Sequence, residues 1–428
     1  MTALTFVLLL FLLMALGMPI AFAMIVAGAA GIFWIGGLTA VVGVLSHVPK
    51  ESGGAYEFLA IPMFLLMAEF VLRSGVADDL FQAAANWFGR VRGGLGIATA
   101  LAGAGFGAIC GSSTASAATL SSTSLPSMLR YGYDTRMASG VVAISGTLSM
   151  LIPPSIAMVV YALLANVSVG RMLIAGVIPG ILVTFTIALT VWVLAVRNPE
   201  HAPLSEPVSW RERIVSLRGI APMVILMAAV SGAIYTGTAT PTEASALGAF
   251  CAAVLYFLRG RRTWVEVYAV LARATRTSCM LAFIIMAAHL FTTFFALTQT
   301  TQNMVAWVGS LDVNRWVIAI IIIFVILILG FFMDQMAILV LTVPVVAPLL
   351  SSLNFDLIWF GVIKIVTAEI GLVTPPLGLN CFVVAKYSKV KVGDVFWGSV
   401  PHVIAHLIII AILVAFPAIS LWLPNQMN

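Results

Sequence analysis

The apolar positions of this chain form long runs, and two of these runs are interrupted by the same pattern of residues. The segments "SMLIPPSIAM" (149–158) and "GLVTPPLGLN" (371–380) each place two adjacent prolines inside an apolar stretch. Proline lacks a backbone N–H, and its ring clashes with the preceding helical turn. It also disfavours a helical conformation for the residue before it. Each proline pair therefore predicts a helix that is broken within its apolar run.

The residue numbers of the two proline pairs differ by 222, and this repeat offset also aligns other residues along the chain. The further aligned pairs are Pro19 with Pro241, Pro126 with Pro348, Asp134 with Asp356, Gly176 with Gly398, and Pro179 with Pro401. A coincidence of helix lengths is the alternative, but it does not explain one constant offset. We therefore expect two repeats, at 1–206 and 223–428, joined by a polar linker at 207–222.

Each repeat is expected to contain the same series of elements. In the first repeat we expect scaffold helices in 1–90, a hairpin and a broken helix in 95–165, and a closing helix in 170–197. In the second repeat the matching ranges are 223–297, 316–385 and 395–424. Among the scaffold helices we expect spans at about 3–17, 19–36 and 58–73, and at about 220–237, 241–258 and 277–297.

The hairpins are predicted from segment length and polarity. Residues 95–110 form about 24 Å of helix at about 1.5 Å per residue, which is shorter than a hydrocarbon core of about 30 Å. The following residues, "GSSTASAATLSSTS", are mostly serine and threonine. Such a run is costly where it faces lipid. We therefore expect it to turn back inside the protein as a re-entrant hairpin that does not cross the membrane.

The composition supports a membrane protein with many spans. Hydrophobic residues make up 62% of the 428 residues and charged residues only 9%, whereas soluble domains have about 25% charged residues. The runs lack the alternation of a β-barrel, so we predict an all-α polytopic membrane protein. The N-terminal run has neither a basic start nor a small-residue cleavage site, so it is expected to be a first span. The four cysteines lie in apolar segments without a CxxC pair, and we expect them to be buried.

The basic residues test the predicted topology. If the hairpins do not cross, each repeat crosses five times, and the odd number inverts the second repeat relative to the first. With the linker in the cytoplasm, all but four of the 21 lysines and arginines fall on the cytoplasmic side or in the linker. The exceptions are Lys50, Arg171 and Arg315 outside and Lys364 within a span. This distribution obeys the positive-inside rule and predicts that both termini are periplasmic.

Inverted repeats with interrupted helices are typical of secondary transporters. The carbonyl groups freed near 146–151 and 371–374 suit a small cation that prefers oxygen ligands. The half-helix after each break presents free N–H groups and a positive dipole end to an anion. One break can therefore offer a cation site and an anion site together. The alternative for each break is a simple packing kink.

Polar residues at the hairpin tips and elsewhere add candidate chemistry. The first tip, "GSSTAS" (111–116), has hydroxyl groups, and the second, "MDQMAI" (333–338), contains Asp334. Asp334 is either a functional intramembrane carboxylate or a helix N-cap. Glu243 lies three residues after Thr240, which is the spacing of a capping box. Three glycines at four-residue spacing indicate close helix packing: Gly103, Gly107 and Gly111.

Other functional classes lack their motifs. A membrane enzyme needs a catalytic cluster, and the chain contains no H-E-x-x-H, no G-x-S-x-G and no paired acidic metal motif. We therefore expect no enzyme and no catalytic residues. A channel is disfavoured because two related tips do not form a ring of repeats.

Lys364 and Glu369 fall on one helix at a spacing of five, which is poor for an intrahelical pair.

Four longer segments occur in this order between residues 107 and 385: "GAICGSSTASAATLSSTSLPSMLRYGYD", "SMLIPPSIAMVVYALLANVSVGRMLIAGVIPG", "TGTATPTEASALGA" and "TPPLGLNCFVVA". With these segments the chain resembles the large membrane (permease) subunit of tripartite ATP-independent periplasmic (TRAP) transporters. The resemblance implies an elevator-type, ion-transporter-like fold in the inner membrane of a bacterial cell. It also implies sodium symport of a small organic acid, such as a C4-dicarboxylate or a sialic acid. The implied partners are a small four-helix membrane subunit, expected as a separate chain, and a periplasmic substrate-binding protein.

The resemblance further implies the residues that bind ions and substrate, with sodium as the coupling ion and no other cofactor. The implied sodium ligands are Ser112, Ser113, Gly146, Ser149 and Pro153 in the first repeat, and Gly330, Asp334, Gly371 and Thr374 in the second. The implied substrate-binding residues are Ser113, Thr114, Pro154, Ser155, Pro376 and Asn380. The topology places a docking surface for the binding protein around 37–57 and 165–171. The alternative is a sodium- or proton-coupled anion carrier of the same broad fold group that needs no binding protein.

Overall fold

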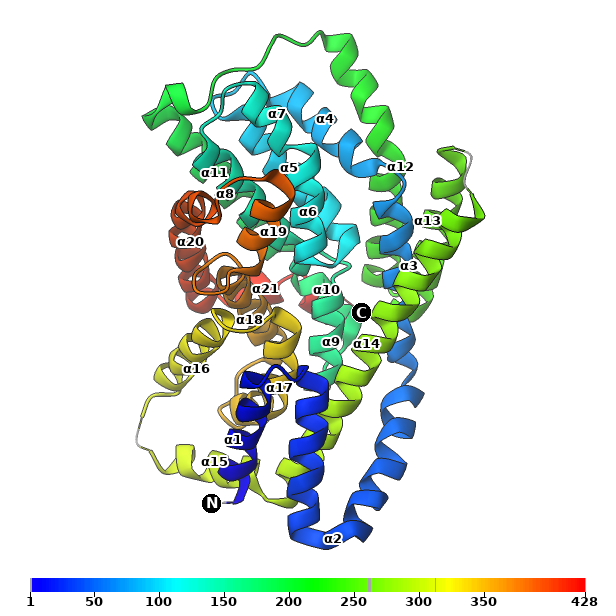
Figure 1. Ribbon diagram of the computed structural model, residues 1–428, viewed down its shortest axis with the longest axis vertical. Helices are drawn as coiled ribbons and strands as arrows, with labels where there is room; N and C mark the ends of the chain where they lie inside the picture. The colour runs from blue at the N-terminus through cyan, green and yellow to red at the C-terminus, as the bar shows by residue number, and fades with distance from the viewer. Residues whose placement is uncertain (1, 261–262, 312, 428) are drawn as a thin grey trace.

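The computed structural model describes residues 2–260, 263–311 and 313–427, and the regular elements in these ranges are all helical. One group of elements includes the first and the middle parts of the chain (Figure 1). Its members are α1 (Thr2–Ala15), α2 (Ile20–Gly54), η1 (Tyr56–Leu59), α3 (Ala60–Leu72), α4 (Val76–Phe88), α12 (Trp210–Tyr235), α13 (Pro241–Leu258), α14 (Trp264–Leu297) and α15 (Thr300–Ser310). Within it, α2 packs along α14 and α3 packs along α13.

The remaining elements form a second group, which we call the inner group, and the elements named above are called the outer group. From the first repeat these are α5 (Gly94–Cys110), α6 (Ser113–Thr123), α7 (Leu125–Arg130), α8 (Thr135–Thr147), η2 (Leu148–Met150), α9 (Ile156–Ala165), α10 (Val169–Ala175), α11 (Val177–Arg197) and η3 (Pro199–His201). From the second repeat they are α16 (Arg315–Gly330), α17 (Gln335–Ser352), α18 (Leu357–Gly371), α19 (Leu379–Ser388), α20 (Val392–Ala415), α21 (Ala418–Leu421) and η4 (Pro424–Gln426).

Within the inner group, the helices of the first repeat recur in the same order in the second repeat, at the predicted offset of 222 residues. The cap residues recur with it: Asp134 begins α8 by accepting hydrogen bonds from two backbone N–H groups, and Asp356 begins α18 in the same way. Each broken helix contains one cis peptide bond, between Pro153 and Pro154 and between Pro375 and Pro376. The local structure thus repeats residue for residue at these positions.

Glycine contacts hold the inner helices close together. A Cβ atom on Gly140 of α8 would overlap the backbone of Gly398 on α20. A Cβ atom on Gly361 of α18 would overlap the ring of Tyr161 on α9. These crossings join the two repeats, so the broken helices share one interior.

Two helices of the outer group are longer than the sequence predicts. The span expected at 277–297 begins at Trp264, because a capping box between Thr263 and Glu266 starts the helix earlier. The helix expected to end near 36 continues as a second arm to Gly54, with a break at Gly37. Hydropathy predicts the membrane-crossing part of a helix, whereas the caps and breaks decide where the helix itself ends.

By length and composition, seven helices of the described chain are able to cross a membrane, or eight if the bent pair α3–α4 is one span. The sequence predicts ten crossings. The ten predicted crossings include α1 and the two broken helices, but α1 and each piece of a broken helix have fewer than 18 residues. The predicted crossings do not include α17, which has 18 residues and is therefore long enough. The burial of the cysteines is predicted correctly only for Cys110 and Cys381. Cys251 and Cys279 are exposed on the outer group, because a membrane helix also presents apolar side chains to lipid.

Candidate functional site

The first broken helix changes from α8 to η2 and restarts as α9. The Ser149 hydroxyl donates to the Gly146 carbonyl at 2.9 Å. The Ser155 hydroxyl donates to the Met150 carbonyl at 2.5 Å and also caps α9 by accepting from the Met158 N–H. The freed carbonyls are therefore hydrogen-bonded to local groups. Since a carbonyl oxygen has two lone pairs, each can still bind a cation.

The second broken helix has the same plan with different local bonds. The Thr374 hydroxyl donates to the Ile370 carbonyl at 2.7 Å. The chain then turns back so that the Asn380 N–H donates to the Leu372 carbonyl at 3.0 Å. Gly378 makes this turn possible, because its φ of +45° lies in the left-handed region.

The first hairpin, α5 and α6, lies against the first break. A Cβ atom on Gly107 would lie 2.8 Å from the Cα of Ser149, so α5 contacts the break directly. A Cβ atom on Gly146 would lie 2.9 Å from the backbone of Ala117 on α6. At the tip, Ser112 caps α6 through the Ala115 N–H. The predicted ridge of glycines therefore packs as expected, with Gly103 also against α8.

The second hairpin, α16 and α17, contacts the second break at the matching place. A Cβ atom on Gly371 would overlap the carbonyl of Gly330. The N–H of Leu377, just after the prolines, donates to the Phe331 carbonyl at 3.2 Å. Asp334 caps α17 by accepting from the Ala337 N–H at 2.7 Å. Its predicted capping role is confirmed.

The structure brings the implied sodium ligands of each repeat onto one hairpin-and-break unit. In the first repeat, Ser112 and Ser113 lie at the tip of the hairpin, and Gly146, Ser149 and Pro153 lie in the break. In the second repeat, Gly330 and Gly371 are in backbone contact, Asp334 begins the second hairpin arm, and Thr374 is one residue before the prolines.

Most of the implied substrate-binding residues are buried. Ser113 is 2% exposed, and Ser155 and Asn380 are completely buried. The Asn380 side-chain N–H donates to the Ala143 carbonyl at 3.2 Å, which ties α19 to α8 of the other repeat. Pro154 is buried as well, whereas Thr114 is half-buried and Pro376 is exposed. In this conformation, then, only part of the implied set is accessible.

Gln335 is a buried polar residue that the sequence reasoning did not single out. It follows Asp334 at the second hairpin tip and is 1% exposed, and neither side-chain amide atom has a hydrogen-bond partner among the described residues. The repeat offset pairs it with Ser113, which is an implied site residue. That offset is therefore the signal in the sequence from which Gln335 could have been found.

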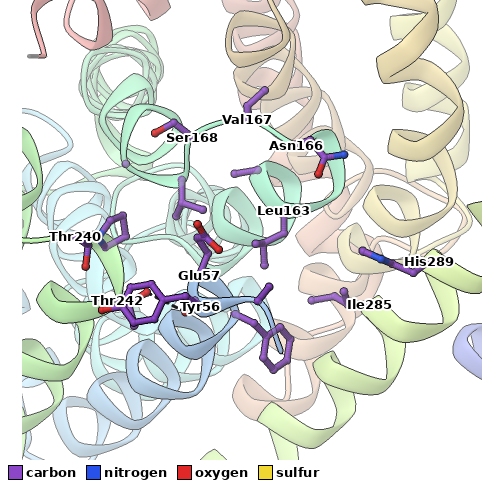
Figure 2. A pocket seen from close by; sticks show the side chains of 16 residues that line it. Tyr56, Glu57, Leu163, Asn166, Val167, Ser168, Thr240, Thr242, Ile285 and His289 are labelled. Carbon is purple, nitrogen blue, oxygen red and sulfur yellow. Dashed lines mark hydrogen bonds between the residues drawn. The ribbon is translucent and has the colours of Figure 1, made fainter. Parts of the chain in front are cut away.

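A pocket of about 620 Å³ with both polar and apolar lining residues lies apart from the hairpins, between the outer group and the turn from α9 to α10. Figure 2 shows Glu57, Asn166 and Thr240 around it, from three separate parts of the chain. The Thr242 hydroxyl donates to the Tyr56 carbonyl at 3.2 Å and joins two of its walls. The pocket brings together the two segments of the predicted docking surface, because its lining includes residues 55–57 and 166–170.

The paired hairpins and broken helices can be compared with known proteins. The family model described as "Tripartite ATP-independent periplasmic transporter, DctM component" matches residues 7–419. The chain belongs to this TRAP transporter family. It is therefore the large permease subunit of a transporter and not an enzyme, and its sequence resemblance to the family is confirmed.

Individual relatives support this assignment of the permease. It is 38% identical, over 88% of each chain, to the C4-dicarboxylate TRAP transporter large permease protein of Pseudomonas aeruginosa. It is 29% identical to the sialic acid TRAP transporter large permease protein of Vibrio cholerae, over 96% of this chain and 95% of the relative. In fold it is similar to the YdaH transporter of Alcanivorax borkumensis, with a TM-score of 0.65, 14% identity and coverage of 97% and 98%. The predicted all-α polytopic membrane fold is thus confirmed.

Proposed function

We propose that this permease imports a small organic acid anion together with sodium ions by an elevator-like alternating-access movement. A periplasmic binding protein delivers the substrate, and a small four-helix membrane subunit completes the assembly in the inner membrane. Both termini of the permease are then periplasmic. Support comes from the relatives, whose named substrates, C4-dicarboxylate and sialic acid, are carboxylates.

The observation on which the proposal rests most is the pairing of each hairpin with a broken helix. Gly107 contacts Ser149 in one repeat, and Gly330 contacts Gly371 in the other, at almost the same place along the hairpin arm. Each contact places a hairpin arm beside carbonyl groups that no longer belong to a continuous helix. Carbonyl and hydroxyl oxygens are good ligands for a hard cation. We assign one sodium site to each unit, with the ligands named above.

The substrate is assigned to the space between the two units. Ser155 caps the N-terminus of α9, and Asn380 lies in the first turn of α19. Both helix starts present N–H groups and the positive end of a helix dipole, which favour a carboxylate. Because Ser155 and Asn380 are buried in this conformation, substrate reaches them only after the units move apart. This requirement supports a conformational cycle.

The binding protein is assigned to the face that contains the pocket of Figure 2. The pocket is lined from the outer group by Glu57 and Thr240, and from the inner group by Asn166 and Ser168. A partner docked across both groups would sense their relative position. Delivery of substrate and opening of the inner site would then be coupled through one surface.

Reconstitution into liposomes tests the proposal. The permease, the small subunit and the binding protein are combined, and uptake of labelled C4-dicarboxylate and sialic acid is measured under an inward sodium gradient. We expect uptake of one of these acids that requires both sodium and the binding protein. Uptake that follows a proton gradient and ignores sodium would contradict the sodium coupling. Uptake without the binding protein would instead favour an independent anion carrier.

A further inference from the structure

One carboxylate in the described interior is without a partner. Glu369, in the last turn of α18, is completely buried, and neither of its carboxylate oxygens has a hydrogen-bond partner among the described residues. An ionised carboxylate is strongly destabilised in a dry interior unless a cation or several donors neutralise it. The isolated position of Glu369 therefore requires an explanation.

Lys364 on the same helix does not neutralise it. The two residues are five positions apart, which places their side chains about 140° apart around the helix axis. The Lys364 ammonium points toward Tyr161 on α9, with its nitrogen 5.9 Å from the centre of that ring. This ammonium is buried and also lacks a hydrogen-bond partner in the part of the chain that the structure describes. Within the described residues, the two charged groups form no ion pair.

The surroundings of Glu369 favour a cation. The carboxylate lies beside Thr147, the last residue of α8. The Thr147 hydroxyl, however, donates to the Ile144 carbonyl at 2.8 Å. Two helix C-termini, those of α8 and α18, thus meet near this carboxylate, and a helix C-terminus has negative partial charge. Thr147 and Glu369 are also equivalent residues of the two repeats, because the repeat offset aligns them.

Charged or titratable groups on the neighbouring helices also form no hydrogen bond or ion pair with Glu369 among the described residues. The helices packed most closely on α18 are α9, α10, α16, α17 and α20. Their charged or titratable side chains are Tyr161, Arg171, Arg315, Asp394, His402 and His406. Among the described residues, none of these forms a hydrogen bond or an ion pair with the Glu369 carboxylate.

We propose that Glu369 is a further sodium-binding carboxylate, placed where the ends of α8 and α18 meet and occupied by Na⁺ during transport. Its ligands are a carboxylate and a neighbouring hydroxyl at the helix ends before the breaks, and neither group is among the sodium ligands named above. The site nevertheless lies close to them, because Thr147 follows Gly146 and Glu369 is two residues before Gly371. It rests on the proposed cation coupling. Binding there would join the two repeats, since one group comes from each.

The test is thermal unfolding of the detergent-purified permease, with NaCl replaced by choline chloride at constant ionic strength, at pH 8 and pH 6. The main variant is Glu369→Gln, which removes the charge and keeps the shape. In choline at pH 8 we expect this variant to unfold about 3 °C above the wild type, because the unneutralised charge is gone. We also expect a weaker dependence of its melting temperature on Na⁺ concentration. Lys364→Met is the matched control and is expected to keep the wild-type Na⁺ dependence.

The identity of the cation follows from the two pH arms. If Na⁺ at pH 8 stabilises the wild type more than Glu369→Gln, the occupant is Na⁺. If acidification does so while Na⁺ acts equally on both, the assignment of Na⁺ to Glu369 is overturned. A wild type that responds to neither cation contradicts the proposed coupling itself. A responsive wild type with a Glu369→Gln variant of equal response and no higher stability overturns the Glu369 assignment alone.

Two further variants keep the test decisive if Glu369→Gln does not give monodisperse protein. Glu369→Asp retains the charge and is expected to keep the slope of the cation dependence with a lower affinity. Thr147→Val removes the neighbouring hydroxyl and is expected to lower the affinity several-fold. The loss of its hydrogen bond to the Ile144 carbonyl is measured separately, as the change in the cation-free melting temperature. Wild-type affinity in both variants would count against the site.

Discussion

The two hairpin-and-break units have the same local design and opposite degrees of burial. In the first unit, Pro153 and Pro154 are buried, and the hairpin arm α5 is buried along most of its length. In the second unit, Pro375 and Pro376 are exposed, and the arm α16 exposes many large apolar side chains. The helix α5 packs against α4, α8 and α11, whereas the main neighbour of α16 is α18. Equivalent segments therefore differ through their neighbours and not through their own folding.

The alternating-access movement proposed above would produce such a difference. Two inverted units that exchange environments during transport cannot both be exposed on the same side at once. A single conformation should show one unit covered and the other open. The following predictions test this comparison, beginning with the largest expected effect.

Substitution of the glycines at the hairpin contacts should abolish folding or transport in both units. A Cβ atom on Gly371 would overlap the Gly330 backbone, and one on Gly107 would lie 2.8 Å from the Ser149 backbone. Backbone cannot move away cheaply, so Gly371→Ala and Gly107→Ala should each cost about 3 kcal/mol or more of unfolding free energy. Melting of the purified protein measures this. Gly232→Ala, which meets no atom within 4 Å, is the control.

The exposure of the second unit should appear in thiol labelling. In a background without the exposed Cys251 and Cys279, Leu377→Cys should react much faster with a water-soluble maleimide than Ser155→Cys. The reason is that Leu377 is 43% exposed and Ser155 is completely buried. Addition of sodium and substrate should narrow the difference if the units move. Equal labelling of the two sites would contradict the difference in accessibility between the two units.

Substitution of Asp334 should show whether this residue only caps α17 or also binds sodium. Asp334→Asn keeps a good N-cap for α17 and removes the charge. If Asp334 binds sodium, the sodium concentration for half-maximal uptake should rise several-fold with little change in melting temperature. Ser112→Ala at the equivalent cap of the first unit should have a smaller effect on sodium, because no charge is lost. An unaltered sodium dependence in Asp334→Asn would leave the residue a helix cap.

The cap at Ser155 should have a modest effect on stability. Its hydroxyl caps α9 and also donates to the Met150 carbonyl. Ser155→Ala should therefore cost about 1 kcal/mol, as for other N-caps. The second unit has no side-chain cap at the start of α19, where Gly378 occupies the N-cap position, so Gly378 offers no equivalent variant. Denaturant unfolding at constant m-value provides the measurement.

Local features of the fold were readable from the sequence because each depends on a few neighbouring residues. Proline pairs predicted the broken helices, and Thr240 with Glu243 predicted a capping box that the structure contains. The constant spacing between the proline pairs predicted elements that recur at the same offset. The additional helix of α2 beyond Gly37 was missed although residues 38–45 are largely apolar, because Gly36 and Gly37 are typical of a helix end.

The candidate site was only partly predictable. The residues that the family resemblance implies for sodium lie on the expected hairpins and breaks, since the resemblance rests largely on the motifs of those segments. The degree to which Ser155 and Asn380 are covered was not predictable, because it depends on α8 and on the closeness of the two units. Gln335, whose amide lacks a partner among the described residues, was missed for the same reason.

The sequence alone therefore determined the helix breaks and the caps, because these follow from backbone chemistry over a few residues. It also determined the repeat, through a constant offset along the chain, and indicated the family through a resemblance that the family model confirmed. Only the tertiary structure decided which hairpin is covered and that Glu369 faces Thr147 instead of Lys364. Burial and electrostatic surroundings depend on segments that are far apart along the chain. Their effect on each side chain is established only when the two halves pack together.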